Sequence, residues 1–282
     1  MAPTPHLVSA SVLRLYVGLC DAQMTSRVGW VDIDADDPAR VLATAEAPVL
    51  DIGEPGAFDD SGVVPTAIVP NRDRLLLYYA GFQRGTKVPY TIFTGLAVSD
   101  DGGQSFVRHG RVPILDRTSQ EPTWRTAAHV VGESGIFRMW YAGGGEWIDL
   151  GGKKVPRLDI RHIDSADGVA WTGPITTCLA VDPKTEVSLG RPWVVRESNG
   201  YAMYYSIRGG ATPYRLASAT SADGLIWTQR VDEPGLALGP EPWDLEMMYA
   251  SSVFRRGERE YLFYNGNDTG ATGVGWAERS RS

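Results

Sequence analysis

Acidic residues stand before several short apolar runs, and they are the side chains best suited to chemistry. Asp59 and Asp60 precede the β-branched run at residues 63–69. The same place before later runs holds further acids and arginines: Glu121 and Arg125, Glu186 and Arg191, Asp244 and Glu246. If the fold brings these positions together, carboxylates with separated pKa values could divide the roles of general acid and base. The alternative is that loops entering strands are simply polar.

Tryptophans accompany these acids. Trp124, Trp193 and Trp243 flank the starts of the apolar runs, and Trp147 follows Glu146. Flat apolar rings beside carboxylates suit a sugar, because the C–H face of the sugar stacks on the ring while its hydroxyls donate to the acids. The pattern therefore indicates a carbohydrate site, and the alternative for each tryptophan is packing between strands.

A repeat of about sixty residues indicates which elements position these groups. Tyrosines recur at intervals of 63, 62, 64 and 59 residues: Tyr16, Tyr79, Tyr141, Tyr205 and Tyr264. Apolar runs separated by turn residues at hairpin distances surround them. The pattern predicts an all-β, five-bladed β-propeller, a single domain over residues 1–282. The last unit is short, so N-terminal residues could complete it, and a β-sandwich is the alternative fold.

A turn motif follows the third strand of three units. SDDGGQSF at 99–106, SADGVAW at 165–171 and SADGLIW at 221–227 resemble the Asp-box hairpin, in which the Asp caps a tight turn above a packed aromatic ring. Asp101, Asp167 and Asp223 are therefore predicted to be structural. This removes three carboxylates from the candidates for chemistry.

The geometry of a meander predicts where the remaining acids lie. The start of the first strand and the turn after the third strand are on opposite faces of an antiparallel meander. The first strand is also the innermost strand of a propeller blade, so residues before it crowd the central axis. We therefore expect Asp60 and its counterparts to meet at one end of the axis, opposite the Asp-box turns.

Cations occupy two loops on the face expected to carry the acids. These residues are Arg84 and Lys87 in one loop, and Lys153, Lys154, Arg157 and Arg161 in the other. They could hold a phosphate or nucleotide leaving group through charge-assisted hydrogen bonds. A solvated loop surface is the alternative.

The composition argues against several functional classes. A formal net charge of −7 argues against nucleic-acid binding, which requires clustered Lys and Arg. Cys20 and Cys178 are the only cysteines, which excludes a disulfide scaffold. No apolar run has membrane-spanning length, and the N-terminus lacks the basic region of a signal peptide. We expect a cytoplasmic protein without cofactor, metal, membrane or nucleic-acid partner, and the oligomeric state stays open.

The repeats, the Asp-box-like turns and the acids before the strands resemble the five-bladed propeller superfamily of glycoside hydrolases, which includes arabinanases, invertases, levansucrases and mannoside phosphorylases. GEPGAFDDSGVVP, GLAVSDDGG, EMMYASSVF and YLFYNGN further resemble an uncharacterised bacterial group of propeller proteins of sugar pathways. The resemblance implies that Asp60 is the base and Glu186 or Glu246 the general acid, with Glu121 or the other glutamate tuning their pKa values. The expected substrate contacts are Asp59, Arg125, Arg191, Glu146, Trp147, Trp124, Trp193, Trp243 and Arg161.

These observations predict a glycosidase-like enzyme that acts on the glycosidic bond of a small sugar by paired-carboxylate chemistry, with inversion. Carboxyl groups about 6.5–9.5 Å apart give inversion, and groups about 5–5.5 Å apart give retention. Two alternatives remain. One is a non-catalytic carbohydrate-binding propeller, and the other is an acid/base transferase or isomerase acting on a sugar-derived biosynthetic intermediate.

Overall fold

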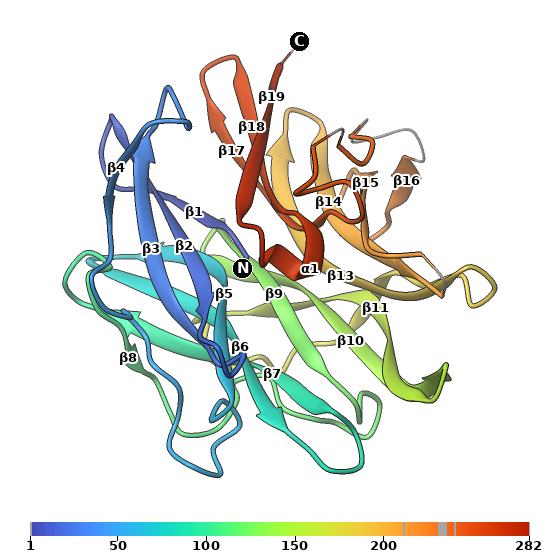
Figure 1. Cartoon of the computed structure of the whole chain (residues 1–282). Coiled ribbons are helices and arrows are strands. Elements are labelled where there is room, and N and C mark those ends of the chain that lie inside the picture. Colours follow the sequence, from blue (N-terminus) through green and yellow to red (C-terminus); the bar gives the residue numbers. More distant parts are fainter. Residues whose placement is uncertain (1, 211, 231–235, 240, 282) are drawn as a thin grey trace.

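The computed structural model of the chain describes residues 2–210, 212–230, 236–239 and 241–281. Its regular structure is β-strand apart from one short helix, α1 (Asn267–Gly270). The strands form successive antiparallel meanders, here units 1 to 5, which lie around a common centre near the N-terminus (Figure 1). This confirms the all-β class, whereas the number of blades stays a prediction. Within the described ranges, no helix has the length and apolar character needed to span a membrane.

The units have the following strands. Unit 1 contains β1 (Thr4–Leu7), β2 (Val12–Cys20), β3 (Ser26–Asp34) and β4 (Val41–Thr44). Unit 2 contains β5 (Gly62–Asn71), β6 (Arg74–Arg84), β7 (Tyr90–Ser99) and β8 (Val107–Arg108). Unit 3 contains β9 (Arg125–Glu133), β10 (Ile136–Leu150), β11 (Lys153–Ser165) and β12 (Thr176–Leu179). Unit 4 contains β13 (Glu186–Glu197), β14 (Gly200–Gly209), β15 (Arg215–Ser221) and β16 (Thr228–Arg230). Unit 5 contains β17 (Tyr249–Arg256), β18 (Arg259–Asn265) and β19 (Val274–Ser280).

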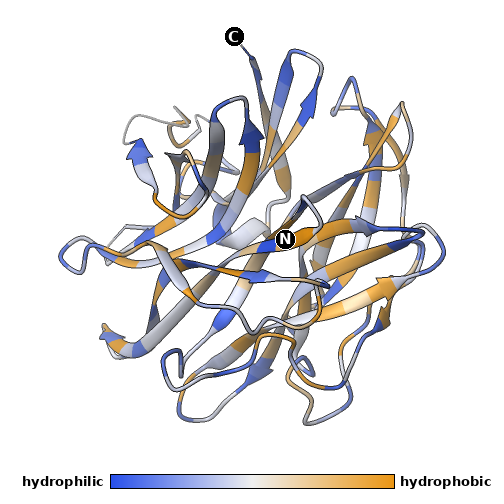
Figure 2. Ribbon diagram, turned by 180° about the vertical axis from the view of Figure 1, so that it is seen from behind, coloured by the Kyte–Doolittle hydropathy of each residue, from blue (hydrophilic) through white to orange (hydrophobic). Residues whose placement is uncertain are grey.

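The second strand of a unit is apolar on both faces because the unit packs between two neighbours. In β6, Leu75, Leu77 and Tyr79 belong to the core cluster shared with unit 1. Leu76 and Tyr78 belong to the cluster shared with unit 3. Successive side chains of a strand point to opposite faces, so an unbroken apolar run fills both junctions. Hydrophobic residues accordingly lie along the strands, and many turns are hydrophilic (Figure 2).

The first and last units are in direct contact. Leu13 of β2 shares a core cluster with Tyr261 and Phe263 of β18. Asp36, which follows β3, forms ion pairs of 3.0 Å with both Arg256 and Arg259. These contacts join the two ends of the series of units.

The N-terminal residues complete unit 1 rather than unit 5. β1 pairs with β2, with Thr4 opposite Tyr16, and so supplies the innermost strand of unit 1. Among the described residues, unit 5 is a three-stranded sheet in the order β17, β18, β19. The expectation that the N-terminus completes the last unit was therefore wrong, because pairing beside β2 is local in sequence.

Three junctions share the same hydrogen bond. It joins an aromatic side chain in the second strand of one unit to the Asp-box turn of the next unit. A side-chain donor binds the carbonyl oxygen of the turn glycine in the pairs Tyr16 and Gly103 (3.0 Å), Tyr78 and Gly168 (2.7 Å), and Trp140 and Gly224 (2.8 Å). Tyr16 is therefore equivalent to Tyr78. The predicted alignment with Tyr79 was wrong by one residue, and Val17 holds the Tyr79 position.

The Asp-box turns have the structure that the sequence predicts. Asp167 Oδ1 accepts two backbone N–H groups at 2.8 Å, and Asp223 and Asp101 do the same in their own turns. Hydrogen bonds from the amides of Ile226 and Leu225 lower the pKa of Asp223 to about 2. The aromatic residues of the turns are buried in core clusters: Phe106, Trp171 and Trp227. The structural assignment of these three aspartates is confirmed.

Candidate functional site

The innermost strands of units 2 to 5 each contain a β-bulge beside the repeated tyrosine of the second strand. At three of these bulges a non-glycine residue has a left-handed backbone, with φ of 53° at Ala127, 51° at Arg191 and 55° at Ala250. Such a conformation costs about 1–3 kcal/mol and persists only where the surrounding structure holds it. Bulges re-aim side chains and are frequent next to active sites.

The bulge in β13 directs Arg191 into the centre of the molecule. Its Nη1 donates to Thr66 O of β5 at 2.9 Å, and its Nη2 donates to Pro3 O at 3.2 Å and to Thr4 Oγ1 at 2.9 Å. The residue is 2% exposed. Burial lowers its pKa to about 10, so the guanidinium is still charged at neutral pH. Arg191 therefore ties β13 to the innermost strands of units 1 and 2.

His129 of β9 lies beside this arginine. Its Nε2–H donates to Val194 O at 3.0 Å, and its ring centroid is 4.3 Å from that of Trp193. Burial, with the charge of Arg191, lowers the pKa of His129 to about 3. The imidazole is therefore neutral in the folded protein at physiological pH.

Three of the acids that precede innermost strands are buried against the repeated tyrosine of their own unit. Each accepts a hydrogen bond from a tyrosine hydroxyl 20 residues later in the pairs Asp59 and Tyr79 (3.0 Å), Glu121 and Tyr141 (2.9 Å), and Asp244 and Tyr264 (2.9 Å). The carboxylates are 1%, 0% and 3% exposed. These acids therefore lie inside the junctions between units.

Two of the buried carboxylates are also ion-paired. Asp59 Oδ2 is 2.8 Å from Arg108 Nε. Glu121 lies 2.8 Å from Arg125 Nε and 3.5 Å from Arg161 Nη1. Each carboxylate is thus held by a tyrosine and at least one arginine. Their predicted contact with substrate, and that of Arg125 and Arg161, stays a prediction.

The other three candidate acids have no cation within ion-pair distance among the described residues. Asp60 is half-buried and accepts Gly56 N–H at 2.8 Å and Ser61 Oγ–H at 2.7 Å. Glu186 is half-buried, and its Oε2 accepts Asp182 N–H at 2.8 Å. Glu246 is exposed. The adjacent residues Asp59 and Asp60 therefore differ sharply in environment, since only Asp59 is enclosed.

Six aromatic side chains lie at the ends of strands on the face where the innermost strands begin. This aromatic array consists of Phe82, Tyr90, Trp124, Trp147, Tyr214 and Tyr249. Ring centroids are 6.0 Å apart for Phe82 and Tyr90, 5.4 Å for Tyr90 and Trp124, 5.8 Å for Trp124 and Trp147, and 4.5 Å for Tyr214 and Tyr249.

The two parts of the array are electrostatically coupled. Burial is the main cause of the raised pKa values of Tyr214 and Tyr249, and Tyr90 raises both further. Tyr90 is 39% exposed, and most of the other rings are half-buried. Two groups of partly exposed rings therefore lie near each other, one from units 2 and 3 and the other from units 4 and 5.

Two of the three unpaired acids are linked to this array by backbone contacts, and the third is close to it in the sequence. Ser61, which follows Asp60, donates its N–H to Phe82 O at 3.0 Å. Glu186 lies opposite Gly209, beside Arg208 of β14. Glu246 precedes Tyr249 by three positions. Carboxylates and partly exposed rings thus occur together, which is the combination that a sugar site requires.

The remaining predicted contacts lie in several environments. Trp193 is 7% exposed and packs in the core between units 4 and 5. The ring of Trp243 stacks on Tyr264 with centroids 5.3 Å apart. Trp147 is in the array, and the neighbouring Glu146 is ion-paired with Arg157. Packing is the main environment of Trp193 and Trp243.

Three of the six loop cations, Lys154, Arg157 and Arg161, are ion-paired with nearby acids. Lys154 is 3.3 Å from Asp149, and Arg161 is 3.3 Å from Asp159. Such pairing within one hairpin reduces the charge available for a phosphate leaving group. In the described part of the chain, no group of three or more His, Cys, Asp or Glu side chains is arranged to hold a metal ion.

Sequence reasoning missed Tyr90, Tyr214, Tyr249 and Arg208. The positions of the three tyrosines could have indicated the site, because Tyr90 and Tyr249 begin strands and Tyr214 directly precedes one. Their positions become informative only when the start of an innermost strand is known to lie beside the start of a third strand. Arg208 belongs to no sequence motif. It is recognised as a candidate only in the structure, because no carboxylate of the described residues lies within ion-pair distance of it.

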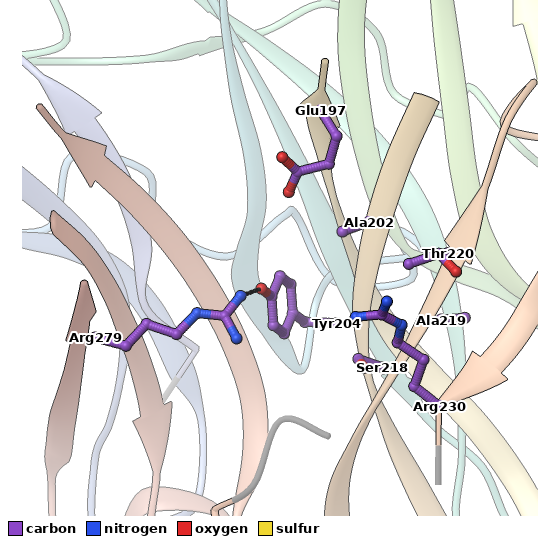
Figure 3. A pocket seen from close by; sticks show the side chains of 8 residues that line it. All are labelled: Glu197, Ala202, Tyr204, Ser218, Ala219, Thr220, Arg230 and Arg279. Carbon is purple, nitrogen blue, oxygen red and sulfur yellow. Dashed lines mark hydrogen bonds between the residues drawn. The ribbon is translucent and has the colours of Figure 1, made fainter. Parts of the chain in front are cut away.

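A separate cavity of about 210 Å³ lies between β14, β15, β16 and β19 (Figure 3). Tyr204 points into it, donates to Glu260 Oε1 at 2.9 Å and accepts a hydrogen bond from Arg279. Tyr204 directly precedes Tyr205, as Tyr78 precedes Tyr79, so Glu260 replaces an Asp-box turn at this junction. The cavity lies at outer strands and belongs to a structural ion-pair network.

Comparisons with known proteins identify the family. The sequence is 32% identical over 275 residues to "Uncharacterized protein Rv1502" of Mycobacterium tuberculosis strain H37Rv, and the match covers 98% of this chain and 90% of the relative. The chain belongs to the family of Rv1502. "Uncharacterized protein MT1551" of strain CDC 1551 matches with the same identity and coverage. No protein-family profile matches the chain.

Solved structures share the fold at low sequence identity. A "Glycoside hydrolase" has a TM-score of 0.74 and 17% identity, over 99% of this chain and 88% of that one. A thermostable family-43 glycoside hydrolase has a TM-score of 0.72 and 15% identity with the same coverage. A β-1,2-mannobiose phosphorylase from Listeria innocua, complexed with β-1,2-mannobiose, has 0.68 and 13%, over 91% and 67%. The chain therefore has the fold of the propeller glycoside hydrolases, which confirms the resemblance drawn from the motifs.

Substitution of Glu121 tests whether the buried acids hold the units together. We expect Glu121→Gln to lower the free energy of unfolding by about 3–5 kcal/mol, because two arginines then lose a buried counter-ion. Urea unfolding measures the change. Glu246→Gln is the matched control and should change stability by less than about 0.5 kcal/mol, since that side chain is exposed. Equal stability of the two variants would contradict the assignment.

The neutral state of His129 predicts a pH dependence of stability. Its folded pKa lies below the unfolded value of about 6.5, so the unfolded chain takes up a proton first as the pH falls. Stability from this group is present above pH 6.5 and declines towards pH 3. His129→Gln should therefore reduce the loss of unfolding free energy between pH 7 and pH 5 by about 2 kcal/mol. The exposed His109→Gln should keep the wild-type slope, and an unchanged slope in His129→Gln would refute the explanation.

Proposed function

We propose that this protein acts on the glycosidic bond of a small sugar that binds against the aromatic array. We further propose that units 1 to 5 are the blades of one closed five-bladed propeller formed by residues 1–282. The core clusters at successive junctions, including the cluster between units 1 and 5, support this count. A closed ring would bring the starts of the innermost strands together at one end.

One observation carries the proposal. Asp60, Glu186 and Glu246 have no cation within ion-pair distance among the described residues. Asp60 adjoins the backbone contact of Ser61 with Phe82, Glu186 is opposite Gly209 beside Arg208, and Glu246 is three positions before Tyr249 in the sequence. By contrast, the acids buried at the junctions between units are enclosed by tyrosine and arginine, as in Asp59 and Glu121. Acids that must exchange protons with a substrate need access to it. The fold shared with glycoside hydrolases adds support.

The roles follow from the chemistry of glycoside cleavage. Asp60 would act as the base that activates water, because its carboxylate accepts only neutral donors and stays partly accessible. Glu186 or Glu246 would protonate the leaving oxygen from the other side of the sugar ring. We propose inversion, which requires the two carboxyl groups to be about 6.5–9.5 Å apart so that a water molecule fits beside the sugar. Glu121 would act indirectly, through Arg125 and Arg161.

A second candidate is a sugar-binding protein without catalysis. A specific observation favours it: Asp60 and Glu186 each accept a backbone N–H from a residue four positions earlier. Carboxylates that cap turns in this way can have a purely structural role. In that case the array would still bind sugars, and hydrolysis would be absent.

Kinetics of acid-to-amide variants distinguish the two candidates. We expect Asp60→Asn to lower kcat for a cleaved glycoside by about 10²–10⁴, the usual contribution of a general acid or base. One of Glu186→Gln and Glu246→Gln should lose activity on alkyl glycosides but retain it on nitrophenyl glycosides, whose leaving groups need no proton. Hydrolysis of a glycoside panel and calorimetric binding are the measurements.

Asp73→Asn is the control, because Asp73 is exposed in the turn between β5 and β6 on the opposite face. It should leave kcat unchanged. Normal hydrolysis in all three variants at the array would refute the catalytic roles. Binding without hydrolysis by the wild-type protein would establish the second candidate instead.

A further inference from the structure

Two arginines beside the aromatic array differ from the other enclosed arginines of the protein. Among the described residues, every other buried or half-buried arginine has a carboxylate within 4.0 Å. The paired residues are Arg14, Arg27, Arg108, Arg125, Arg138, Arg157, Arg161, Arg255, Arg256 and Arg259. Arg191 and Arg208 have none. Both belong to unit 4 and lie on the side of the array formed by Tyr214 and Tyr249.

Arg191 carries a charge that only neutral groups solvate. Its partners are two carbonyl oxygens and one hydroxyl, and its Nε is buried without a partner. Arg191 is close enough to the array to act on Tyr249 electrostatically. Burial raises the pKa of Tyr249, and the positive charge of Arg191 lowers it. A desolvated cation of this kind attracts an anion more strongly than an exposed one, since the local dielectric constant is low.

Arg208 is the more accessible of the two. It stands at the end of β14, half-buried, with its guanidinium carbon 5.8 Å from the centroid of the Tyr214 ring. Glu186 is the nearest acid in the strand register, opposite Gly209, but its carboxylate accepts Asp182 N–H and forms no ion pair with Arg208. The guanidinium therefore retains donors for a ligand.

Other buried polar atoms on the innermost strands also lack partners. They include Thr126 Oγ1 of β9 and Ser251 Oγ and Ser252 Oγ of β17. Buried polar groups are nearly always hydrogen-bonded to protein, water or ligand. β9 and β17 both contact β13, the strand of Arg191, so several polar atoms without a partner lie on strands that adjoin it.

We propose that the substrate is an acidic sugar whose carboxylate or phosphate group binds Arg208 and the hydroxyls of Tyr214 and Tyr249, with Arg191 adding a fixed positive charge behind them. This rests on the proposed function, because it assigns the charge of a sugar that lies against the array. Guanidinium groups suit planar or tetrahedral oxyanions through paired N–H donors. The acids on the other parts of the array stay available for the glycosidic bond.

Binding measurements with matched ligands test the assignment. Calorimetry with the full chain would compare glucuronate, glucose 1-phosphate, glucose and inorganic phosphate. We expect at least one acidic sugar to bind about tenfold more tightly than glucose, and Arg208→Gln to remove that advantage, as expected for loss of one charge-assisted hydrogen bond. Added salt should weaken binding of the acidic sugar to the wild-type protein and have less effect on the variant. The preferred ligand distinguishes carboxylate from phosphate.

Arg72→Gln is the control, because it removes the same charge from an exposed turn on the opposite face. Its affinities should equal those of the wild-type protein. If neutral and acidic sugars bind equally and Arg208→Gln changes neither, the acidic-sugar assignment is overturned and the sugar site stands. If inorganic phosphate binds through Arg208 but no sugar binds, the anion site stands and the proposed function fails. If none of the four ligands binds, both are overturned.

Discussion

A buried arginine that has no counter-ion among the described residues lies where the innermost strands of three units meet. Arg191 donates to backbone oxygens of Thr66 and Pro3 and to the hydroxyl of Thr4, so one side chain joins units 1, 2 and 4. Its left-handed backbone and its desolvated charge are both costly. The structure maintains them through the packing of the surrounding units. The same residue places a positive charge behind the tyrosines of the array, which links the architecture to the choice of ligand.

Carboxylates at equivalent sequence positions serve two different purposes. Asp59, Glu121 and Asp244 lie inside junctions and accept hydrogen bonds from a tyrosine of their own unit. Their loss would leave buried donors unsatisfied, so they specify how units pack. Asp60 and Glu246, one and two residues further along, lie outside these junctions. A buried acid and an accessible acid are therefore only one or two residues apart, in the short loop that precedes an innermost strand.

The sequence predicted the repeating elements well because their signals are local. Apolar runs, turn residues and the Asp-box motifs each act over fewer than about ten residues, and the corresponding strands and turns are present. The pairing of β1 and the equivalence of Tyr16 with Tyr78 were missed, because each depends on a partner in another segment. The environments of Asp59 and Asp60 could not be separated, since adjacent residues have the same local sequence. Arg208 has no carboxylate partner among the described residues because the fold places every described acid beyond ion-pair distance from it. No sequence motif predicts that arrangement.

We expect a sugar to bind where the innermost strands begin, between the accessible acids and the two arginines that have no carboxylate partner among the described residues. The most direct measurement is a crystal structure of the protein soaked with a mixture of uronic acids, sugar phosphates and neutral monosaccharides. We expect electron density for one ligand against the rings of Tyr90, Trp124 and Tyr249, with its acidic group within hydrogen-bond distance of Arg208. Ordered ligand only at the cavity between units 4 and 5, or on the face of the Asp-box turns, would contradict it.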